Sequence, residues 1–236
     1  MKSARPLPAW LWLGVPVGIV LAQIGAKSAS EEFYRTWLHG EFGLVENLTV
    51  LFLVFGVFST LKLWSLRTAV DSKLFGPFAL IMALGCFFFA GEEASWGQHW
   101  IGFEGPDFVA ARNDQGEFNI HNDPLLETVF DQLPRNLLTL AALIGGVCAP
   151  ILLRRRRRVW PEFRSRGVQG WIWPTAVCIP TAVLALVVTL PKKFTGDQVP
   201  RAFDFSGGET KEMALALFLM LYLTTLRREL QARAPS

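Results

Sequence analysis

The residues of this chain whose types could do chemistry are concentrated between Gly91 and Asp123, directly behind a long apolar run. Carboxylates, imidazoles and carboxamides are the groups that proteins use for proton transfer and metal binding. This stretch holds all three kinds, in the order Glu92, Glu93, His99, Glu117, Asn119, His121 and Asn122. Its composition is the strongest functional signal in the sequence.

Glu92 and Glu93 stand where an apolar helix is expected to end. Adjacent carboxylates repel each other, the C-terminal end of a helix is itself negative, and partial burial disfavours charge. The pair therefore needs a bound cation, a basic partner or a shared proton. In the simpler alternative Glu93 stays in solvent at the membrane surface, and Glu92 pairs with an arginine: Arg35, Arg112 or Arg135.

A convergent set of imidazoles and carboxylates would suit Zn²⁺, Mn²⁺ or iron, whereas carboxylates alone would suit Ca²⁺ or Mg²⁺. No HExxH or similar signature occurs, so this expectation depends on clustering rather than on a motif. We expect the catalytic groups to be Glu92, Glu93 and His121. We expect a divalent metal (Zn, Mn, Fe or Ca) to be held by residues from the set Glu46, Glu92, His99, Glu117 and His121.

Several of these residues also have a purely structural interpretation. His99 lies between Trp96 and Trp100 and could belong to an interfacial aromatic belt. His121 could serve a turn, because the nearby glycine and asparagines favour a turn over a helix. Acidic residues near the start of an apolar segment satisfy the helix N-terminus without further function, and this is the favoured interpretation of Glu209 and Glu212.

The elements that must position these residues are membrane helices. The chain has 236 residues, 51% of them hydrophobic, and a mean hydropathy of +0.32, which indicates one integral membrane domain over 1–236. We predict an all-α, polytopic helical bundle with about six transmembrane helices and an interfacial helix in the outer 91–135 segment. The predicted spans are 7–26, 42–66, 74–100, 136–153, 171–190 and 211–226.

Two features of the apolar runs have alternative interpretations. The first run follows two basic residues and precedes small ones, so a cleaved signal peptide over about 1–30 is the alternative to a first span. The cysteines Cys86, Cys148 and Cys178 all lie inside apolar runs without CxxC spacing. We interpret them as small buried hydrophobic residues rather than as metal or redox groups.

Basic residues predict the orientation. With the N-terminus in the cytoplasm, fifteen of the 23 basic residues fall on the inner side, including the run from Arg154 to Arg158. Seventeen of the 20 acidic residues and all three histidines then fall on the outer side. We therefore expect a protein of the bacterial inner (plasma) membrane, with both termini in the cytoplasm and a site facing the periplasm or exterior. The arginine run beside a span indicates contact with anionic lipid, and no nucleic acid is expected.

The string Glu92-Glu93-Ala94-Ser95-Trp96 resembles the paired-glutamate motif of the CAAX-type membrane proteases, in which glutamate and histidine on membrane helices activate water. The resemblance covers five residues. That family's following Arg-Gly is Gly97-Gln98 here, and its later histidine motifs are missing because His121 is the last histidine. Membrane ceramidases also have closely spaced late histidines, which are absent here. The chain is assigned to neither family.

Three classes of function fit these observations. The first is a metal-dependent hydrolase or transferase that acts on a lipid or lipid-linked substrate, with a glutamate as general base. A cation or proton transporter, with Glu46 and Glu92 as half-buried sites, is the second. The third is a non-catalytic membrane partner or assembly factor whose acidic outer surface binds another protein. The oligomeric state is not predicted.

Overall fold

The computed structural model of the chain describes residues 4, 6–39, 43–113, 116–149, 152, 168, 171–204 and 207–233. Every regular element in these residues is helical. The α-helices are α1 (Val15–Ala29), α2 (Glu31–Trp37), α3 (Leu44–Ser65), α4 (Phe75–Glu93), α5 (Gln98–Ile101), α6 (Asp107–Ala110), α7 (Leu133–Ala141), α9 (Ile179–Val187), α10 (Leu190–Thr195) and α11 (Gly207–Arg233). The predicted all-α fold class is confirmed for the described part of the chain.

Short 3₁₀ and π-helical segments join or extend several of these helices. The 3₁₀ segments are Arg67–Ala69, Ser95–Gly97, Ala176–Cys178, Gly196–Gln198 and Arg201–Phe203. The π-helical segments are Trp10–Gly14, Thr128–Gln132 and Ala142–Cys148. The last two flank α7 and make one helical rod over 128–148.

Four described helical stretches are long and apolar enough to cross a membrane: Trp10–Ala29, Leu44–Ser65, Phe75–Glu93 and Ala176–Thr195. Each has at least 19 residues, which at 1.5 Å per residue approaches or reaches the ~30 Å of hydrocarbon in a bilayer. They correspond to the predicted first, second, third and fifth spans. The architecture is that of a helical membrane protein.

The third span is shorter than the predicted 74–100, because α4 ends at Glu93. Ser95 and Trp96 adopt φ values of 42° and 52°, and Gly97 follows with φ 93°. Residues with these left-handed φ values cannot continue a right-handed helix. The predicted continuous helix over 74–100 is therefore wrong beyond Glu93.

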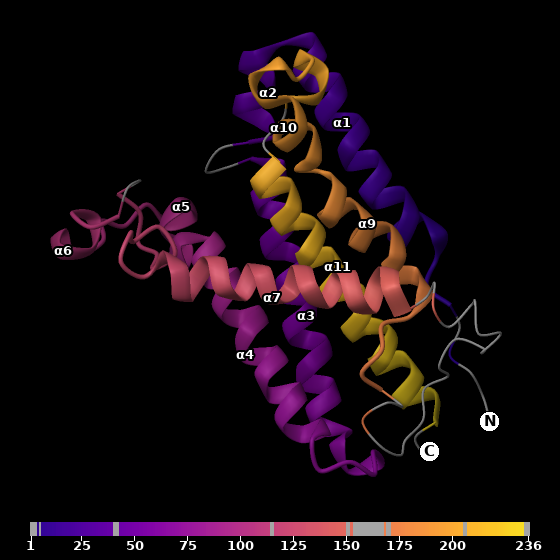
Figure 1. Cartoon of the computed structure of the whole chain (residues 1–236). Helices are drawn as coiled ribbons and strands as arrows, with labels where there is room; N and C mark the ends of the chain where they lie inside the picture. Colours follow the sequence, from indigo (N-terminus) through magenta and orange to yellow (C-terminus); the bar gives the residue numbers. More distant parts are fainter. Residues whose placement is uncertain are drawn as a thin grey trace.

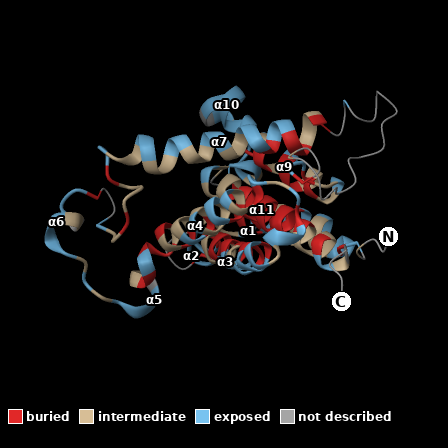
Figure 2. Cartoon of the chain, turned by 90° about the horizontal axis from the view of Figure 1, so that it is seen from below, coloured by how far each residue is buried: buried red, intermediate tan, exposed pale blue. Residues whose placement is uncertain are grey.

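The core of the bundle is α11, which replaces the predicted span 211–226 with a longer helix. Its residues from Met213 to Tyr222 are all buried, so the helix is enclosed on every side (Figure 2). A helix that is apolar all round belongs at the centre of a bundle. Its neighbours are mainly α3 and α9, and the Ser59 and Thr224 hydroxyls lie 3.2 Å apart across the contact with α3.

The rod over 128–148 lies across the other long helices in Figure 1 rather than beside them. Pro134 is the second residue of α7, directly after the π-helical segment 128–132, and the rod continues through it. This rod contains the start of the predicted span 136–153, and the six-span count remains a prediction.

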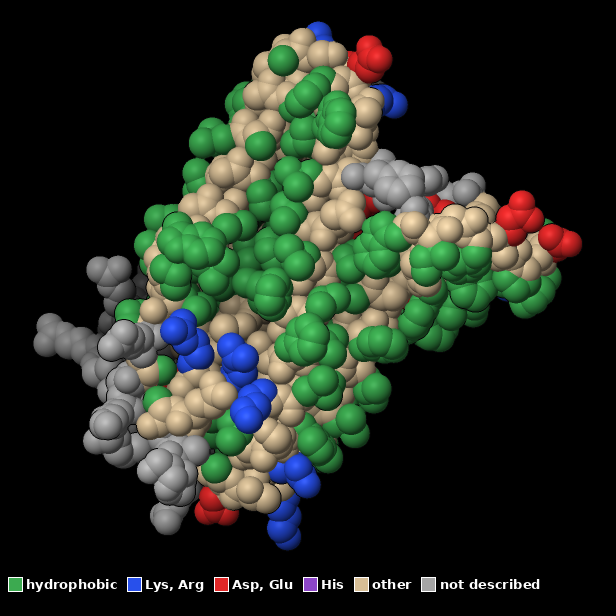
Figure 3. Space-filling model, turned by 180° about the vertical axis from the view of Figure 1, so that it is seen from behind, with side chains coloured by type: hydrophobic (Ala, Val, Ile, Leu, Met, Phe, Trp, Pro, Cys, Tyr) green, Lys and Arg blue, Asp and Glu red, His purple; other side chains and the backbone are tan. Residues whose placement is uncertain are grey.

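A polar lobe projects sideways from the end of α4 and contains α5 and α6 (Figure 1). On the face shown in Figure 3, hydrophobic side chains cover most of the bundle, while acidic side chains appear on the lobe and at the top of the view. Basic side chains gather toward the lower end. The arginine run at 154–158 lies outside the described residues.

Candidate functional site

The candidate site lies where α3, α4 and α11 begin or end beside the first turns of the crossing rod. A cavity of about 370 Å³ opens there. It is lined by Glu46, Glu93, Glu117, His121, Asn122, Glu127, Asp131, Arg135, Glu209 and Glu212. Seven of these ten side chains are carboxylic acids, so the cavity has a strongly negative character.

Glu92 ties the lobe to the end of α4. Its side chain is buried, with 1% of its surface exposed. Oε2 accepts hydrogen bonds from the backbone N–H groups of Ile120 (2.7 Å) and His121 (2.9 Å), and Oε1 accepts one from the Trp96 indole (2.7 Å). A carboxylate with several N–H donors is stabilised without a basic partner. The buried carboxylate of Glu92 is therefore stabilised by N–H donors of the lobe.

His121 also turns its ring toward Glu92. Nδ1 of His121 lies 3.4 Å from Oε2 of Glu92, and the His121 side chain is about one quarter exposed. A carboxylate at Nδ1 fixes the orientation of an imidazole and leaves Nε2 as the nitrogen for a reacting molecule. His121 lines the cavity, so the pair has the arrangement of a general base with its orienting acid.

Trp96 reaches Glu92 because the chain reverses immediately after α4. The indole lies against Gly91, where an added Cβ would stand 2.8 Å from the ring. Only glycine at position 91 leaves room for this contact. The left-handed turn at residues 95 and 96 is thus used to direct a hydrogen-bond donor back onto the buried carboxylate.

Glu117 is held by a second set of hydrogen bonds within the lobe. Its Oε2 accepts from the Ser95 hydroxyl at 2.9 Å and from the amides of Asn119 and Asn122 at 2.6 Å and 3.3 Å. Asn119 is 3% exposed and also accepts from Asn113 at 2.7 Å. Buried polar networks of this kind fix one geometry when every member is paired. The turn predicted around His121 is built in this way.

Arg135 lines both the acidic cavity and the adjoining recess and has an acidic partner on each of two helices. It forms ion pairs with Asp131, one turn earlier in the rod, and with Glu212 of α11. Burial raises the pKa of Asp131 above its ordinary value, and the charge of Arg135 acts in the opposite direction. Arg135 thus joins the rod to the central helix and offsets part of the negative charge of the cavity.

A narrower cavity of about 40 Å³ adjoins the first and shares Glu93, His121, Asp131, Arg135 and Glu212 with it. Glu92 also lines it. Its other walls are mainly apolar and lie deeper in the bundle: Leu53, Phe89, Phe130, Leu138, Leu215, Ala216 and Leu219. The polar cavity therefore continues into an apolar recess between the helices.

The structure brings most of the predicted site residues to one place. Glu46, Glu93, Glu117 and His121 line the acidic cavity, and Glu92 lines the adjoining recess. The side chain of His99 is outside the described part of the chain. Within the described residues no three His, Cys, Asp or Glu side chains are grouped closely enough to hold a metal ion directly. The metal set remains a prediction.

The arginine partners weighed for Glu92 are engaged elsewhere. Arg35 pairs with Glu31 at 2.8 Å, and Arg112 pairs with Asp123 at 2.8 Å. Arg135 pairs with Asp131 and Glu212. Cys86 and Cys178 are buried, as the sequence predicts, whereas Cys148 is only half-buried.

Sequence reasoning missed the contribution of Asp131, Arg135, Glu209 and Glu212 to the site. The two glutamates were explained by the helix N-terminus, yet both line the cavity. One available signal was the i, i+4 pair Asp131 and Arg135, which lies at the start of an apolar run, where ionisable residues usually face a protein interior or water. The pairing of Arg135 with Glu212 joins residues 77 positions apart and has no local sequence signature.

Comparisons with known proteins assign no function to this chain. The chain matches no protein-family description, no curated protein and no solved structure.

Proposed function

We propose that the acidic cavity is the active site of a membrane hydrolase or transferase that acts on a lipid or lipid-linked substrate. The observation that carries the proposal is the contact between buried Glu92 and the ring of His121 at the wall of a cavity. A polar cavity with a few convergent ionisable groups is the usual setting of an active site.

In this proposal His121 is the general base. Nε2 accepts a proton from water or from an acceptor hydroxyl as its oxygen attacks a carbonyl or phosphoryl centre. Glu92 at Nδ1 stabilises the imidazolium that forms, and the imidazolium then returns the proton to the leaving group. Glu93, the carboxylate next to Glu92 in the chain, lines both the acidic cavity and the adjoining recess.

A substrate with a polar and an apolar end suits a polar cavity that opens between apolar helices. The reacting group would lie beside His121 among the carboxylates, and the recess of about 40 Å³ toward Leu53 and Leu219 would take only a small apolar group next to it. Membrane lipids and lipid-linked molecules have this form. Two of the helices around the recess, α3 and α4, are long and apolar enough to stand in a bilayer.

The seven carboxylates of the cavity face one arginine, which supports a bound cation. Carboxylate and water oxygens are the ligands that Ca²⁺ and Mn²⁺ prefer, whereas Zn²⁺ prefers nitrogen and sulfur ligands in a tetrahedral arrangement. Such an ion would be held partly through water, since no three ligands are grouped in the described residues. A divalent cation would polarise the attacked oxygen.

The proposed orientation places both termini in the cytoplasm and the cavity on the outer side of a plasma or bacterial inner membrane. In Figure 1 α4 and α9 run toward the same end of the bundle, so the chain must return between them. We propose that the fourth of the six crossings lies within this return. Basic side chains at the lower end in Figure 3 support this orientation.

The test is turnover by the purified full-length protein in vesicles made from the total lipid extract of its host membrane. Lipid products are followed by mass spectrometry with and without added Ca²⁺ or Mn²⁺. We expect a product with the wild type and a loss of at least about a hundredfold in His121→Gln, because a general base contributes ~10²–10⁴-fold. Glu104→Gln, an exposed change in the same lobe, is the control and should keep full turnover. Turnover that persists in His121→Gln would contradict the proposal.

A cation transporter is the second candidate, and the excess of carboxylates in the cavity favours it. The recess below the cavity ends among leucine, alanine and phenylalanine side chains, which offer no further ligand for an ion. The enzyme therefore fits the described geometry better. Ion flux in reconstituted vesicles that is abolished by Glu46→Gln, without any lipid product, would reverse this order.

A further inference from the structure

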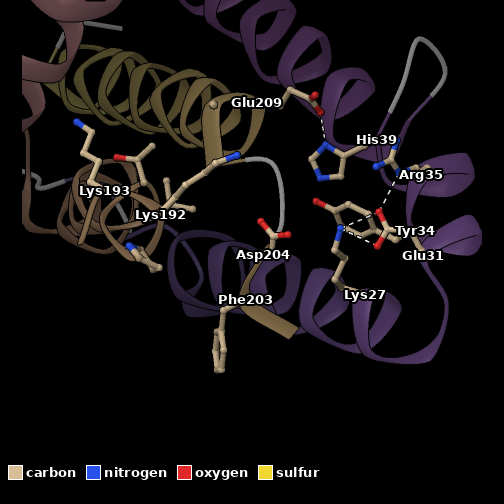
Figure 4. A pocket seen from close by; sticks show the side chains of 15 residues that line it. Lys27, Glu31, Tyr34, Arg35, His39, Lys192, Lys193, Phe203, Asp204 and Glu209 are labelled. Carbon is tan, nitrogen blue, oxygen red and sulfur yellow. Dashed lines mark hydrogen bonds and ion pairs between the residues drawn. The ribbon is translucent and has the colours of Figure 1, made fainter. Parts of the chain in front are cut away.

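A second pocket, of about 740 Å³, lies at the end of the bundle where α1 meets α2 and α10 precedes α11 (Figure 4). A volume of ~300–1,000 Å³ is typical of sites for small organic ligands. The pocket touches the acidic cavity only through Glu209, which lines both. The side chains of this pocket, apart from Glu209, are therefore distinct from those of the acidic cavity.

One wall of the pocket carries charges that are already paired. Glu31 binds Lys27 at 2.8 Å and Arg35 at 2.8 Å. These two partners lower the pKa of Glu31 to about 2. Lys27 is buried, with 6% exposure, and its ammonium also lies 4.5 Å from the centre of the Tyr34 ring. This wall is a fixed frame with one net positive charge.

The opposite wall carries charges of both signs that are not paired with each other. Lys192 and Asp204 lie across the pocket from Lys27 and Glu31 in Figure 4, and Lys193 also lines it. No ion pair of these three side chains is found among the residues that the structure describes. Glu209, by contrast, contacts His39, which is itself buried and held by Gln23 at 3.0 Å. Asp204 is thus the carboxylate best placed to receive a cation.

Phe203 lines the pocket, and two of the helices that form the pocket carry other exposed aromatic side chains, Trp37 on α2 and Phe194 on α10. Trp37, Phe194 and Phe203 are 64%, 82% and 50% exposed. Exposed aromatic side chains at the end of apolar helices mark the level of the lipid headgroups. The pocket therefore lies where a headgroup could enter from the membrane.

We propose that this pocket binds a zwitterionic phosphoester, with the phosphate at Lys192 and Lys193 and a cationic amine at Asp204. A phosphoethanolamine group carries one charge of each sign a few bonds apart, and side chains of both signs line the pocket. The source is either the headgroup of phosphatidylethanolamine or a soluble phosphoethanolamine. The inference does not depend on catalysis by Glu92 and His121.

The experiment measures lipid retention by native mass spectrometry, with the full chain taken from vesicles of equal phosphatidylethanolamine and phosphatidylglycerol. Both lipids carry a phosphodiester, but only the first carries an amine. We expect the wild type to retain phosphatidylethanolamine in preference. The double variant Lys192→Gln/Lys193→Gln should retain about tenfold less of it, since charge-assisted contacts to phosphate are lost. Asp204→Asn should keep phosphate binding and lose the preference for the amine.

The control is Lys62→Gln/Lys73→Gln, which removes two exposed lysines at the opposite end of the bundle and should leave retention unchanged. Competition by O-phosphoethanolamine identifies the source: release of the lipid by the soluble compound supports a soluble ligand, and retention of the lipid supports the headgroup. Equal retention of both lipids by the wild type would overturn the proposal. So would a double variant that retains as much phosphatidylethanolamine as the wild type.

Discussion

Oε2 of Glu92 lies 2.9 Å from the backbone nitrogen of His121 and 3.4 Å from Nδ1 of the same residue. One buried oxygen thus fixes both the position and the orientation of this histidine. Both carboxylate oxygens of Glu92 accept N–H donors, whereas glutamine has only one acceptor oxygen, so at least one of these donors would lose its partner. We expect Glu92→Gln to lower the free energy of unfolding by about 1–3 kcal/mol for this reason. Thermal unfolding in detergent measures the change.

The matched control for this substitution is Glu104→Gln, which alters an exposed carboxylate of the same lobe. Surface changes of this kind are usually within about ±0.5 kcal/mol. If both variants unfold at the same midpoint as the wild type, Glu92 does not anchor the lobe.

Gly91→Ala should disrupt the same anchor from the other side. The added Cβ would stand 2.8 Å from the Trp96 ring and displace the indole that donates to Glu92. We expect a loss of about 1–3 kcal/mol in the free energy of unfolding, as for other overpacked sites. Gly85→Ala on the same helix has no heavy atom within 4 Å of the new Cβ. That control should be neutral or stabilising by up to about 1 kcal/mol, because alanine favours helix. Equal losses in both variants would contradict the contact.

Arg135→Gln should leave Asp131 and Glu212 facing each other without their shared cation. We expect the free energy of unfolding to fall by about 2–4 kcal/mol. This is somewhat less than the loss for a fully buried ion pair, because all three side chains are partly exposed. Adding Glu212→Gln should recover part of this loss by removing one of the two carboxylates. The two single variants and the double variant are compared by unfolding. Strictly additive losses would show that Arg135 and Glu212 are not coupled.

The sequence predicts the helices better than it predicts their ends. Long apolar runs require helices in a membrane because the backbone must pair its own N–H and C=O groups, and four of the predicted spans were found. The stop at Glu93 depends on the left-handed turn at Ser95 and Trp96, which ordinary propensities do not favour. The turn is stabilised by contacts of Trp96 with Gly91 and Glu92, and these appear only in the fold.

The sequence predicts those residues of the candidate site that are ionisable and lie within or beside apolar segments. Glu46, Glu93, Glu117 and His121 were chosen on that ground, and all four line one cavity. Glu209 and Glu212 had a sufficient local explanation at a helix start, so their long-range partners His39 and Arg135 could not be foreseen. Pairings across the bundle require the packing of α11 against its neighbours.

Stability should also depend on pH through Glu31. Lys27 and Arg35 lower its folded-state pKa from 4.5 to about 2. A depressed carboxyl pKa adds stability above pH 4.5, and this contribution is lost as the pH falls through about 2. Glu31→Gln should therefore be less stable than the wild type at neutral pH, and the difference should shrink on acidification.

Because Arg35 is exposed and Glu31 is partly exposed, the difference should also shrink in high salt. Glu32→Gln, the neighbouring residue of α2, is the control. A Glu31→Gln difference that stays constant between neutral pH and pH 2 would show that the ion pairs do not contribute.

The most direct test of the central claim is a double-mutant cycle on lipid turnover with Glu92→Gln, His121→Gln and the combined variant. Residues that act as one catalytic unit give strongly non-additive losses. We predict that the double variant is no slower than His121→Gln alone, because Glu92 acts through the imidazole. Independent, multiplying losses from the two substitutions, or turnover that survives both, would contradict the account.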